Sequence, residues 1–424
     1  MKTLFTLLTL LPILSFSQHI LFLGGTVHVG NGESIDVSAV AINNGKIELV
    51  ADAKAIRINP QAYDTIIHIY DHHVYPGFIS TNTTLGITEI SAVRATNDYR
   101  ETGVFKPHVR SLIAYNAESV ITPTIRSNGV LLAQVAPKGG RISGTSSVMK
   151  LDGWNWEDAA QKVDDGIHLN WPKYFVTTGW WANPGDIKKT DEYHKQCGEI
   201  KEYFKRSKSY YESNNPINDI QMRAMKELFN GKKRLYIHAN TQREMKDAIL
   251  MAKEMNIEHF ALVGGQQAHK ITSFLKEHDV PVLLDRIHRL PSTEDSDVDM
   301  PYKQAKVLFD AGIVFGFCYQ GDMEAMGQRN LPFSAGTAVA HGLPYEQAVA
   351  ALTHNTAKIL GIDDKVGTLL AGKEATFFIS KGDALDMMGN DVKHAYIQGK
   401  AINLDNKHKA LNRKYRKKHN LSID

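Results

Sequence analysis

Hydrophobic and polar positions form two different patterns along the chain. At residues 20–50, short apolar runs alternate with Gly-Gly, Gly-Asn-Gly and Asn-Asn-Gly turn sequences, and a similar series of short runs returns at residues 367–400. Turns of these types between short strands indicate a small antiparallel sheet. Because the two series flank a long middle region, we expect one composite β domain built from both ends of the chain.

The middle region alternates apolar runs with amphipathic helical patterns, most regularly in its second half. Apolar runs lie at 234–239, 259–263, 280–284 and 313–318, and helical patterns follow at 242–255, 266–278, 300–311, 331–341 and 345–360. This alternation is typical of parallel β/α units. The first half is less regular, and residues 139–218 predict a long loop region with one helix near 156–163.

The fold class follows from this order and from the length of the chain. A chain of 424 residues is too long for one simple core and suits a barrel of about 250 residues with a smaller companion domain. We therefore expect an α/β protein with a TIM-type (β/α)8 barrel at residues 74–361. A small composite β-sandwich domain at residues 18–73 and 362–403 and a basic tail at 404–424 account for the rest.

Composition excludes several classes of protein. With 43% hydrophobic and 22% charged residues, the chain has an ordinary globular composition, which excludes disordered and collagenous proteins. Two cysteines, Cys197 and Cys318, cannot make a disulfide framework or a cysteine-based zinc site. The formal charge is +3, but residues 404–424 carry +5. The remainder therefore lacks the broad basic surface of a nucleic-acid-binding protein, and we expect no nucleic-acid partner.

The basic tail itself leaves several interpretations open. Its short run of lysines and arginines contains one aromatic residue, Tyr415. Nucleic acid and anionic membrane are both conceivable partners for such a run, but its length favours a solvated helix end or a docking tail.

Residues 1–17 have the organisation of a secretory signal peptide. Lys2 precedes a thirteen-residue apolar run, and the small residues Ser15 and Ser17 lie just before Gln18. A bilayer span needs about 20 apolar residues, so this run, which Pro12 interrupts, is too short to be an anchor. No other stretch is long and apolar enough to span a membrane. We expect cleavage after Ser17 and a periplasmic or secreted mature protein.

The segment YPGFISTNTTLG at residues 75–86 resembles the first barrel strand of the amidohydrolase superfamily, nearest its imidazolonepropionase-like branch. The segments LFLGGTVHVGNGESI and VGTLLAGKEATFFISKGDAL are similar to the two parts of that family's β domain, and LTHNTAKILGID resembles its final barrel helix. The resemblance covers nearly all of residues 20–402. It implies the barrel fold and hydrolysis of C–N bonds in cyclic amides or peptide-like small molecules.

The same resemblance implies one or two divalent metals such as zinc. Family members hold them with a His-x-His pair ending the first strand, histidines on the fifth and usually the sixth strand, and an Asp on the eighth. Here Asn82 and Thr84 occupy the His-x-His positions, Gln320 occupies the Asp position, and His238 on the fifth strand is retained. Catalytic zinc needs about three protein ligands, and neutral oxygens supply no charge to balance a dication. We therefore expect no resident metal or other cofactor.

Seven residues are candidates for a site at the barrel mouth. His238 is the catalytic candidate, because strand ends at this face point into the site. Candidates for substrate binding are Asn82, Thr84, Arg94, Arg126, Gln320 and Asp322. Guanidinium groups hold carboxylates bidentately without a metal, although each arginine could instead pair with a neighbour such as Asp98 or Glu101.

The glycine-rich stretch PKGGRISGT at residues 137–145 has its lysine ahead of the glycines. It therefore lacks the arrangement of a phosphate-binding loop, and we expect a flexible loop over the barrel mouth. Two functions remain open. The first is an exported amidohydrolase. The second is a catalytically silent relative that binds a small ligand or supports an active homologue in a homo- or hetero-oligomer.

Overall fold

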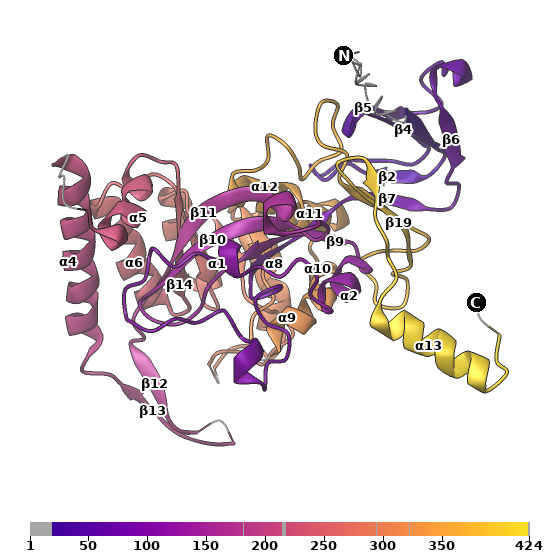
Figure 1. Ribbon diagram of the computed structural model, residues 1–424. Coiled ribbons are helices and arrows are strands. Elements are labelled where there is room, and N and C mark those ends of the chain that lie inside the picture. The colour runs from indigo at the N-terminus through magenta and orange to yellow at the C-terminus, as the bar shows by residue number, and fades with distance from the viewer. Residues whose placement is uncertain (1–18, 181, 214–217, 294, 322, 423–424) are drawn as a thin grey trace, which may run out of the picture.

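The computed structural model describes residues 19–180, 182–213, 218–293, 295–321 and 323–422. The chain is an α/β protein in which a nearly closed barrel of eight strands lies beside β sheets formed by both terminal regions. In Figure 1 the indigo N-terminal strands and the yellow strand β19 (Val392–Ile397) lie together at one end of the molecule. The predicted fold class is confirmed.

The barrel strands are hydrogen-bonded in the order β17-β16-β15-β14-β11-β10-β9-β8. Their bounds are β8 (Phe78–Thr83), β9 (Val130–Val135), β10 (Ile142–Lys150), β11 (Ala160–Asn170), β14 (Arg234–Ala239), β15 (Phe260–Gly264), β16 (Val282–Leu284) and β17 (Phe315–Phe317). All neighbours are parallel except β10, which is antiparallel to both β9 and β11. The end strands β8 and β17 approach each other, since Thr81 Oγ1 donates to the carbonyl of Phe317 over 3.2 Å.

Helices cover the outside of the barrel and connect its strands. They are α4 (Tyr193–Glu212), α5 (Ile220–Phe229), α6 (Gln242–Glu254), α7 (Thr272–Glu277), α8 (Met300–Asp310), α10 (Leu331–Ala340), α11 (Tyr345–Leu352) and α12 (His354–Leu360). Helix α6 begins with a capping box, in which Thr241 and Glu244 satisfy each other's backbone donors. The predicted strand at 234–239 and helices at 242–255 and 300–311 are confirmed to within a residue.

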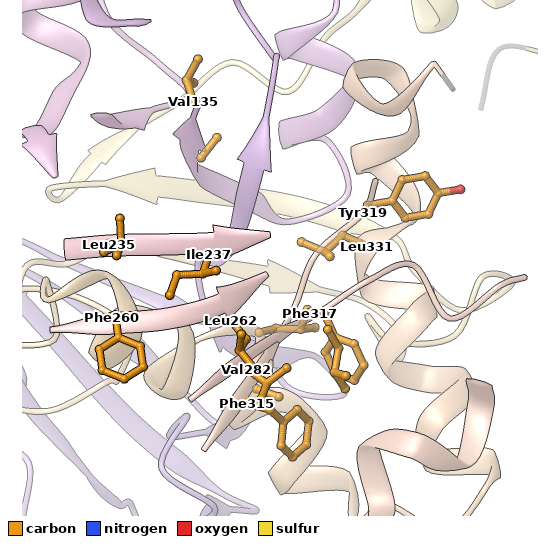
Figure 2. Packing of buried hydrophobic residues seen from close by; sticks show 14 of the residues in the cluster. Val135, Leu235, Ile237, Phe260, Leu262, Val282, Phe315, Phe317, Tyr319 and Leu331 are labelled. Atoms are coloured by element: carbon orange, nitrogen blue, oxygen red, sulfur yellow. The ribbon is translucent and has the colours of Figure 1, made fainter. Parts of the chain in front are cut away.

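The barrel strands β9, β15, β16 and β17 and most of β14 are apolar because both of their faces are buried, as in other parallel sheets. Leu235 and Ile237 on β14 pack with Leu262 in the layer between strands and helices (Figure 2). Tyr236, between them in sequence, belongs instead to a separate cluster with Ala261 on the neighbouring strand, as alternation along a strand requires. Continuous apolar runs in the sequence therefore correspond to strands with helices on one side and the barrel interior on the other.

The terminal regions form two further sheets. One has the order β5-β4-β1-β6 and the other β20-β19-β18-β7-β2-β3. Their bounds are β1 (Ile20–Leu23), β2 (Thr26–His28), β3 (Ser34–Ile35), β4 (Ser38–Asn43), β5 (Lys46–Asp52), β6 (Thr65–His68), β7 (His73–Pro76), β18 (Phe377–Ser380) and β20 (Lys400–Ala401). Phe22 of the first sheet packs its ring 5.4 Å from that of Phe377 and 5.3 Å from that of Tyr396 in the second. These ring contacts join strands from the two ends of the chain.

The region 139–218 differs from the expectation of a long loop. It contains two long barrel strands, β10 and β11, a hairpin of β12 (Phe175–Trp180) and β13 (Asn183–Lys189), and helix α4. The predicted helix near 156–163 is only α3 (Trp156–Ala159). Strand β10 escapes recognition because its sequence, ISGTSSVMK, is rich in Ser, Thr and Gly although eight of its nine residues are buried.

The expected signal peptide lies outside the described residues. Within the described residues, no helix is long and apolar enough to cross a membrane. The basic tail contains helix α13 (Lys407–Lys418).

Candidate functional site

The mouth of the barrel lies where the parallel strands end, and the end of β8 provides its first polar group. Asn82 is 1% exposed and has a left-handed backbone, with φ of 50°. Asparagine tolerates this conformation better than most residues because its short polar side chain bonds locally. The backbone N–H of Asn82 donates to Gln134 Oε1 over 3.1 Å, so the turn at the strand end is fixed from the next strand.

Lys138 supplies a cation at this position. Its Nζ donates to both the carbonyl and the side-chain oxygen Oδ1 of Asn82, over 2.7 and 2.8 Å. Burial lowers the pKa of Lys138, while the carboxylates of Glu324 and Asp285 oppose that shift. The segment that resembled a loose glycine loop thus places its lysine inside the mouth.

Two histidines form a hydrogen-bonded pair across neighbouring strands. Nδ1 of His168 on β11 lies 2.9 Å from Nε2 of His238 on β14. Burial and the Lys138 ammonium lower the pKa of His238 to about 3. Burial, His238 and Lys138 also lower the pKa of His168 well below its usual range. Both rings are therefore neutral near pH 7, and one donates to the other. His168 is fully buried, and its Nε2 has no hydrogen-bond partner.

A polar network in the barrel interior supports both groups. The buried carboxylate of Asp165 accepts hydrogen bonds from Ser146 Oγ, Gln134 Nε2 and Tyr236 Oη over 2.7, 2.8 and 2.7 Å. The ring of Tyr236 stacks on His168 with centroids 4.9 Å apart. Because Gln134 also holds the backbone of Asn82, one network positions Asn82 and His168 from below.

Glu324, on α9 (Glu324–Gly327), ties the opposite side of the mouth to β8. It accepts hydrogen bonds from the Thr83 hydroxyl, the Thr84 N–H and Gln328 Nε2 over 2.8, 2.6 and 2.8 Å. A cavity of about 570 Å³ opens here, and Thr84, Lys138, Gln320 and Glu324 are among the residues that line it. Its volume lies in the range of small-molecule sites, about 300–1,000 Å³.

Residues 72–402 match the sequence profile of the Amidohydrolase family. The chain belongs to this family. The matched segment includes the whole barrel and the strands β7, β18, β19 and β20 of the terminal sheets. No curated protein matches the chain.

Solved structures show the same fold at low sequence identity. An amidohydrolase from Thermotoga maritima MSB8 superimposes with a TM-score of 0.76 and 23% identity over 91% of this chain and 99% of that one. A prolidase crystallised with N-methylphosphonate-L-proline gives 0.55 and 15% over 91% and 99%. Molinate hydrolase gives 0.55 and 13% over 92% and 95%. At these identities the similarity establishes the fold alone.

The residues present at the mouth do not fit the divalent metal that the amidohydrolase family implies. Within the described residues, no three or more His, Cys, Asp or Glu side chains are grouped so that they could hold a metal ion. The cation at the mouth is instead Lys138, bonded to Asn82. Burial raises the pKa of Cys318 to about 12, so it is a thiol and not a thiolate ligand.

Four of the sequence candidates lie at the mouth of this amidohydrolase barrel. Asn82 and His238 contact the network described above, and Thr84 and Gln320 line the cavity. The Gln320 amide donates to Cys318 Sγ over 3.4 Å. Asp322 lies outside the described residues.

Neither of the two candidate arginines is among the residues that line this cavity. Arg94 is exposed on the turn η2 (Arg94–Thr96), where its Nη1 donates over 2.8 Å to the carbonyl of Asn97 in its own loop. Arg126 ends helix α2 (Thr122–Arg126), before β9 begins, and pairs with Asp152 over 2.6 Å. The expectation that Arg126 lies at the mouth is wrong, because PTIR is helical and precedes β9, which places its arginine at the end of the barrel where that strand begins.

Sequence reasoning missed Lys138, His168 and the interior network around Asp165. One signal for His168 was available, since Ile167 to Asn170 reads Ile-His-Leu-Asn and Ile237 to Asn240 reads Ile-His-Ala-Asn. The repeat lies near the ends of two adjacent parallel strands, β11 and β14, with an offset of two residues, since His168 pairs with Tyr236 and His238 with Asn170. No comparable local signal distinguished Lys138 from an exposed loop lysine.

Proposed function

We propose that this chain is a member of the amidohydrolase family that binds a small molecule at its barrel mouth and lacks the metal-dependent hydrolysis of its relatives. The observation that carries this proposal is the position of Lys138, whose ammonium donates twice to Asn82 at the end of the first barrel strand. Asn82 stands in the first of the two positions where the family places its His-x-His pair. A lysine cation held there opposes the approach of a dication and supplies no lone pair for it.

The chemistry of the mouth favours a ligand with a carbonyl or carboxylate group. An ammonium has three donors and no acceptor, and Asn82 takes two of them. The third is available to an oxygen of the ligand. Glu324, which also lines the cavity, already accepts three hydrogen bonds. It therefore acts as a support for β8 more than as a receptor for a cationic ligand.

The neutral histidine pair suits binding better than proton transfer. Burial and Lys138 lower the pKa of His238 to about 3, so the protonated form is scarce near pH 7. A general acid–base catalyst works best when its pKa lies near the operating pH, and the pKa of His238 lies far below it. His238 is partly accessible and His168 is buried. The neutral ring of His238 is therefore the part of the pair that a ligand can contact.

The second candidate is the activity implied by family membership, hydrolysis of C–N bonds in cyclic amides or peptide-like small molecules. The match over residues 72–402 favours it. It requires water to be activated without the family's metal arrangement, because no described residue at the mouth lowers the pKa of water as a bound metal does. We also propose that the protein is exported after cleavage near Ser17 and belongs to the imidazolonepropionase-like branch, on the sequence features given above.

A thermal-shift screen of carboxylate and amide metabolites, combined with elemental analysis, tests the proposal. Ligand at 100 times its Kd stabilises a folded protein by about 2.7 kcal/mol, which for a chain of this length is a shift of a few degrees. We expect hits whose shifts disappear in Lys138→Met and survive in Lys303→Met, a matched change at a partly exposed, salt-bridged lysine on α8. Lys138→Arg, which keeps the charge, covers the case in which Lys138→Met fails to fold.

Two outcomes would contradict the proposal. One is a divalent metal retained at one per chain after dialysis and lost from Asn82→Ala or His238→Ala, together with hydrolysis of an amide. That result would favour the second candidate. The other is a set of shifts that Lys138→Met and Lys138→Arg both leave unchanged, which would place the ligand elsewhere.

A further inference from the structure

The C-terminal helix α13 projects away from the body of the protein (Figure 1). Every residue of the helix is exposed except Arg416, which is partly exposed. The first turn of the helix attaches it to the body. The side chain of Asn406 caps Lys409 N over 3.0 Å and donates to Ser127 Oγ over 3.3 Å, and Arg413 forms a bidentate ion pair with Asp405.

The helix carries an unusual charge for an unsupported element. Seven of its twelve residues are Lys or Arg and none is acidic. Lys409 and Arg413, Arg413 and Lys417, and Lys414 and Lys418 are four residues apart, a spacing at which like charges repel on a helix surface. Isolated helices of about 12 residues are also marginal in water. An anionic surface would remove the repulsion and favour the helix.

Two apolar side chains of α13 lie together on its surface, bordered by Lys407, four residues before Leu411, and by Lys418, three residues after Tyr415. Leu411 and Tyr415 are four residues apart and therefore share a face, where they are 39% and 56% exposed. His408 and His419 lie three residues before Leu411 and four after Tyr415, on the same side. The helix thus combines a narrow apolar strip with a broad cationic surface. This division is typical of helices that lie in the interface of a bilayer.

We propose that α13 is a docking helix for the surface of an anionic phospholipid bilayer. Its lysines and arginines contact the headgroups, and Leu411 and Tyr415 enter the boundary between headgroups and acyl chains. Residues 1–403 carry a net charge of −2. The negative surface potential of the bilayer therefore attracts the helix and gives no net attraction for the rest of the chain. This inference is independent of what binds at the barrel mouth.

A polynucleotide is the less favoured partner. Binding to phosphate backbones without sequence preference uses basic groups and several aromatic side chains on which bases stack. Helix α13 has one aromatic ring, and that ring shares its face with a leucine. Leu411 and Tyr415 can be buried at the surface of a bilayer, whereas a phosphate backbone offers them no apolar partner.

Vesicle flotation with the mature full-length chain tests the proposal. We expect binding to vesicles of equimolar phosphatidylcholine and phosphatidylglycerol, at least about tenfold weaker binding to pure phosphatidylcholine, and release as salt is raised. Replacing Lys414, Lys417 and Lys418 together by Gln should weaken binding to the anionic vesicles by at least about tenfold.

A matched control replaces three exposed lysines of the body, Lys188, Lys195 and Lys205, by Gln, and should leave binding unchanged. The double change of Leu411→Ala with Tyr415→Ala should weaken vesicle binding even at low salt. Equal binding to neutral and anionic vesicles would overturn the proposal, as would equal losses in the tail and control variants. Duplex DNA or RNA bound more tightly than vesicles, with no effect of the apolar double change, would assign the helix to nucleic acid instead.

Discussion

The interior network around Asp165 gives the most quantitative test of the structure. Asp165 is fully buried and accepts from the hydroxyl of Tyr236 over 2.7 Å and from Gln134 Nε2 over 2.8 Å. A buried donor that loses its acceptor costs more than the hydrogen bond contributed, because the donor has left water and gained nothing. Replacement of Asp165 by Ala leaves both donors in this state. Ser146, the third donor, can still reach the carbonyl of Gly166 at 3.2 Å.

The expected losses of unfolding free energy follow from these counts. Tyr236→Phe removes one hydrogen bond to a carboxylate and should cost about 2 kcal/mol. Asp165→Ala orphans two donors at about 1–3 kcal/mol each and should cost about 4 kcal/mol. In the double variant the Tyr236 hydroxyl is absent, so its orphan penalty vanishes. The double variant should therefore be no less stable than Asp165→Ala alone, which corresponds to a coupling of at least about 2 kcal/mol.

Urea unfolding of the wild type, both single variants and the double variant measures this cycle. Tyr203→Phe is the matched control, because the Tyr203 hydroxyl is buried without a hydrogen-bond partner and its removal should cost nothing. Losses in the two single variants that add to within about 0.5 kcal/mol would refute the network. So would a Tyr236→Phe loss no larger than that of Tyr203→Phe.

Three further predictions concern packing, pH and processing. Gly336→Ala should destabilise the protein by about 1–3 kcal/mol, because a Cβ there would lie 2.1 Å from the carbonyl oxygen of Leu385. Gly198→Ala on α4, where a Cβ meets nothing within 4 Å, should instead stabilise the protein. Thermal unfolding of the two variants measures both effects. Burial and Lys138 lower the pKa of His238 from 6.5 to about 3, so between these values the unfolded chain binds the extra proton. The stability contributed by the neutral ring is complete above about pH 6.5 and falls as the pH drops, by about 2 kcal/mol at pH 5. Unfolding of the wild type and His238→Gln at pH 8 and pH 5 measures this, and identical acid losses would contradict it. N-terminal mass spectrometry of exported protein should find Gln18 first, and an intact Met1 in membrane fractions would contradict the signal peptide.

The sequence by itself determined the fold class and the strands and helices that are buried through apolar side chains. The run at 234–239 coincides with β14, and the helix predicted at 242–255 coincides with α6 to one residue. These elements can be predicted because the spacing of apolar residues along the sequence indicates which side chains are buried. The terminal β series likewise predicted sheets from both ends, since turn sequences act over a few residues. The expected positions of Asn82, Thr84 and Gln320 at the mouth came instead from the resemblance to the amidohydrolase superfamily, whose metal-ligand positions they occupy.

Only the tertiary structure decided what fills the mouth. Lys138 meets Asn82 across 56 positions of sequence, and Asp165 meets Tyr236 across 71. A polar side chain that is buried against a partner distant in sequence has the same sequence neighbours as one in solvent. For this reason the sequence of β10 resembled a loop, and Lys138 resembled a surface lysine. Arg126 shows the converse error, because a local pattern does not tell at which end of the barrel a residue emerges. The periodicity of a sequence indicates which apolar side chains are buried. A buried polar group is stable only when it has a hydrogen-bond partner, and these partners meet only when the barrel closes.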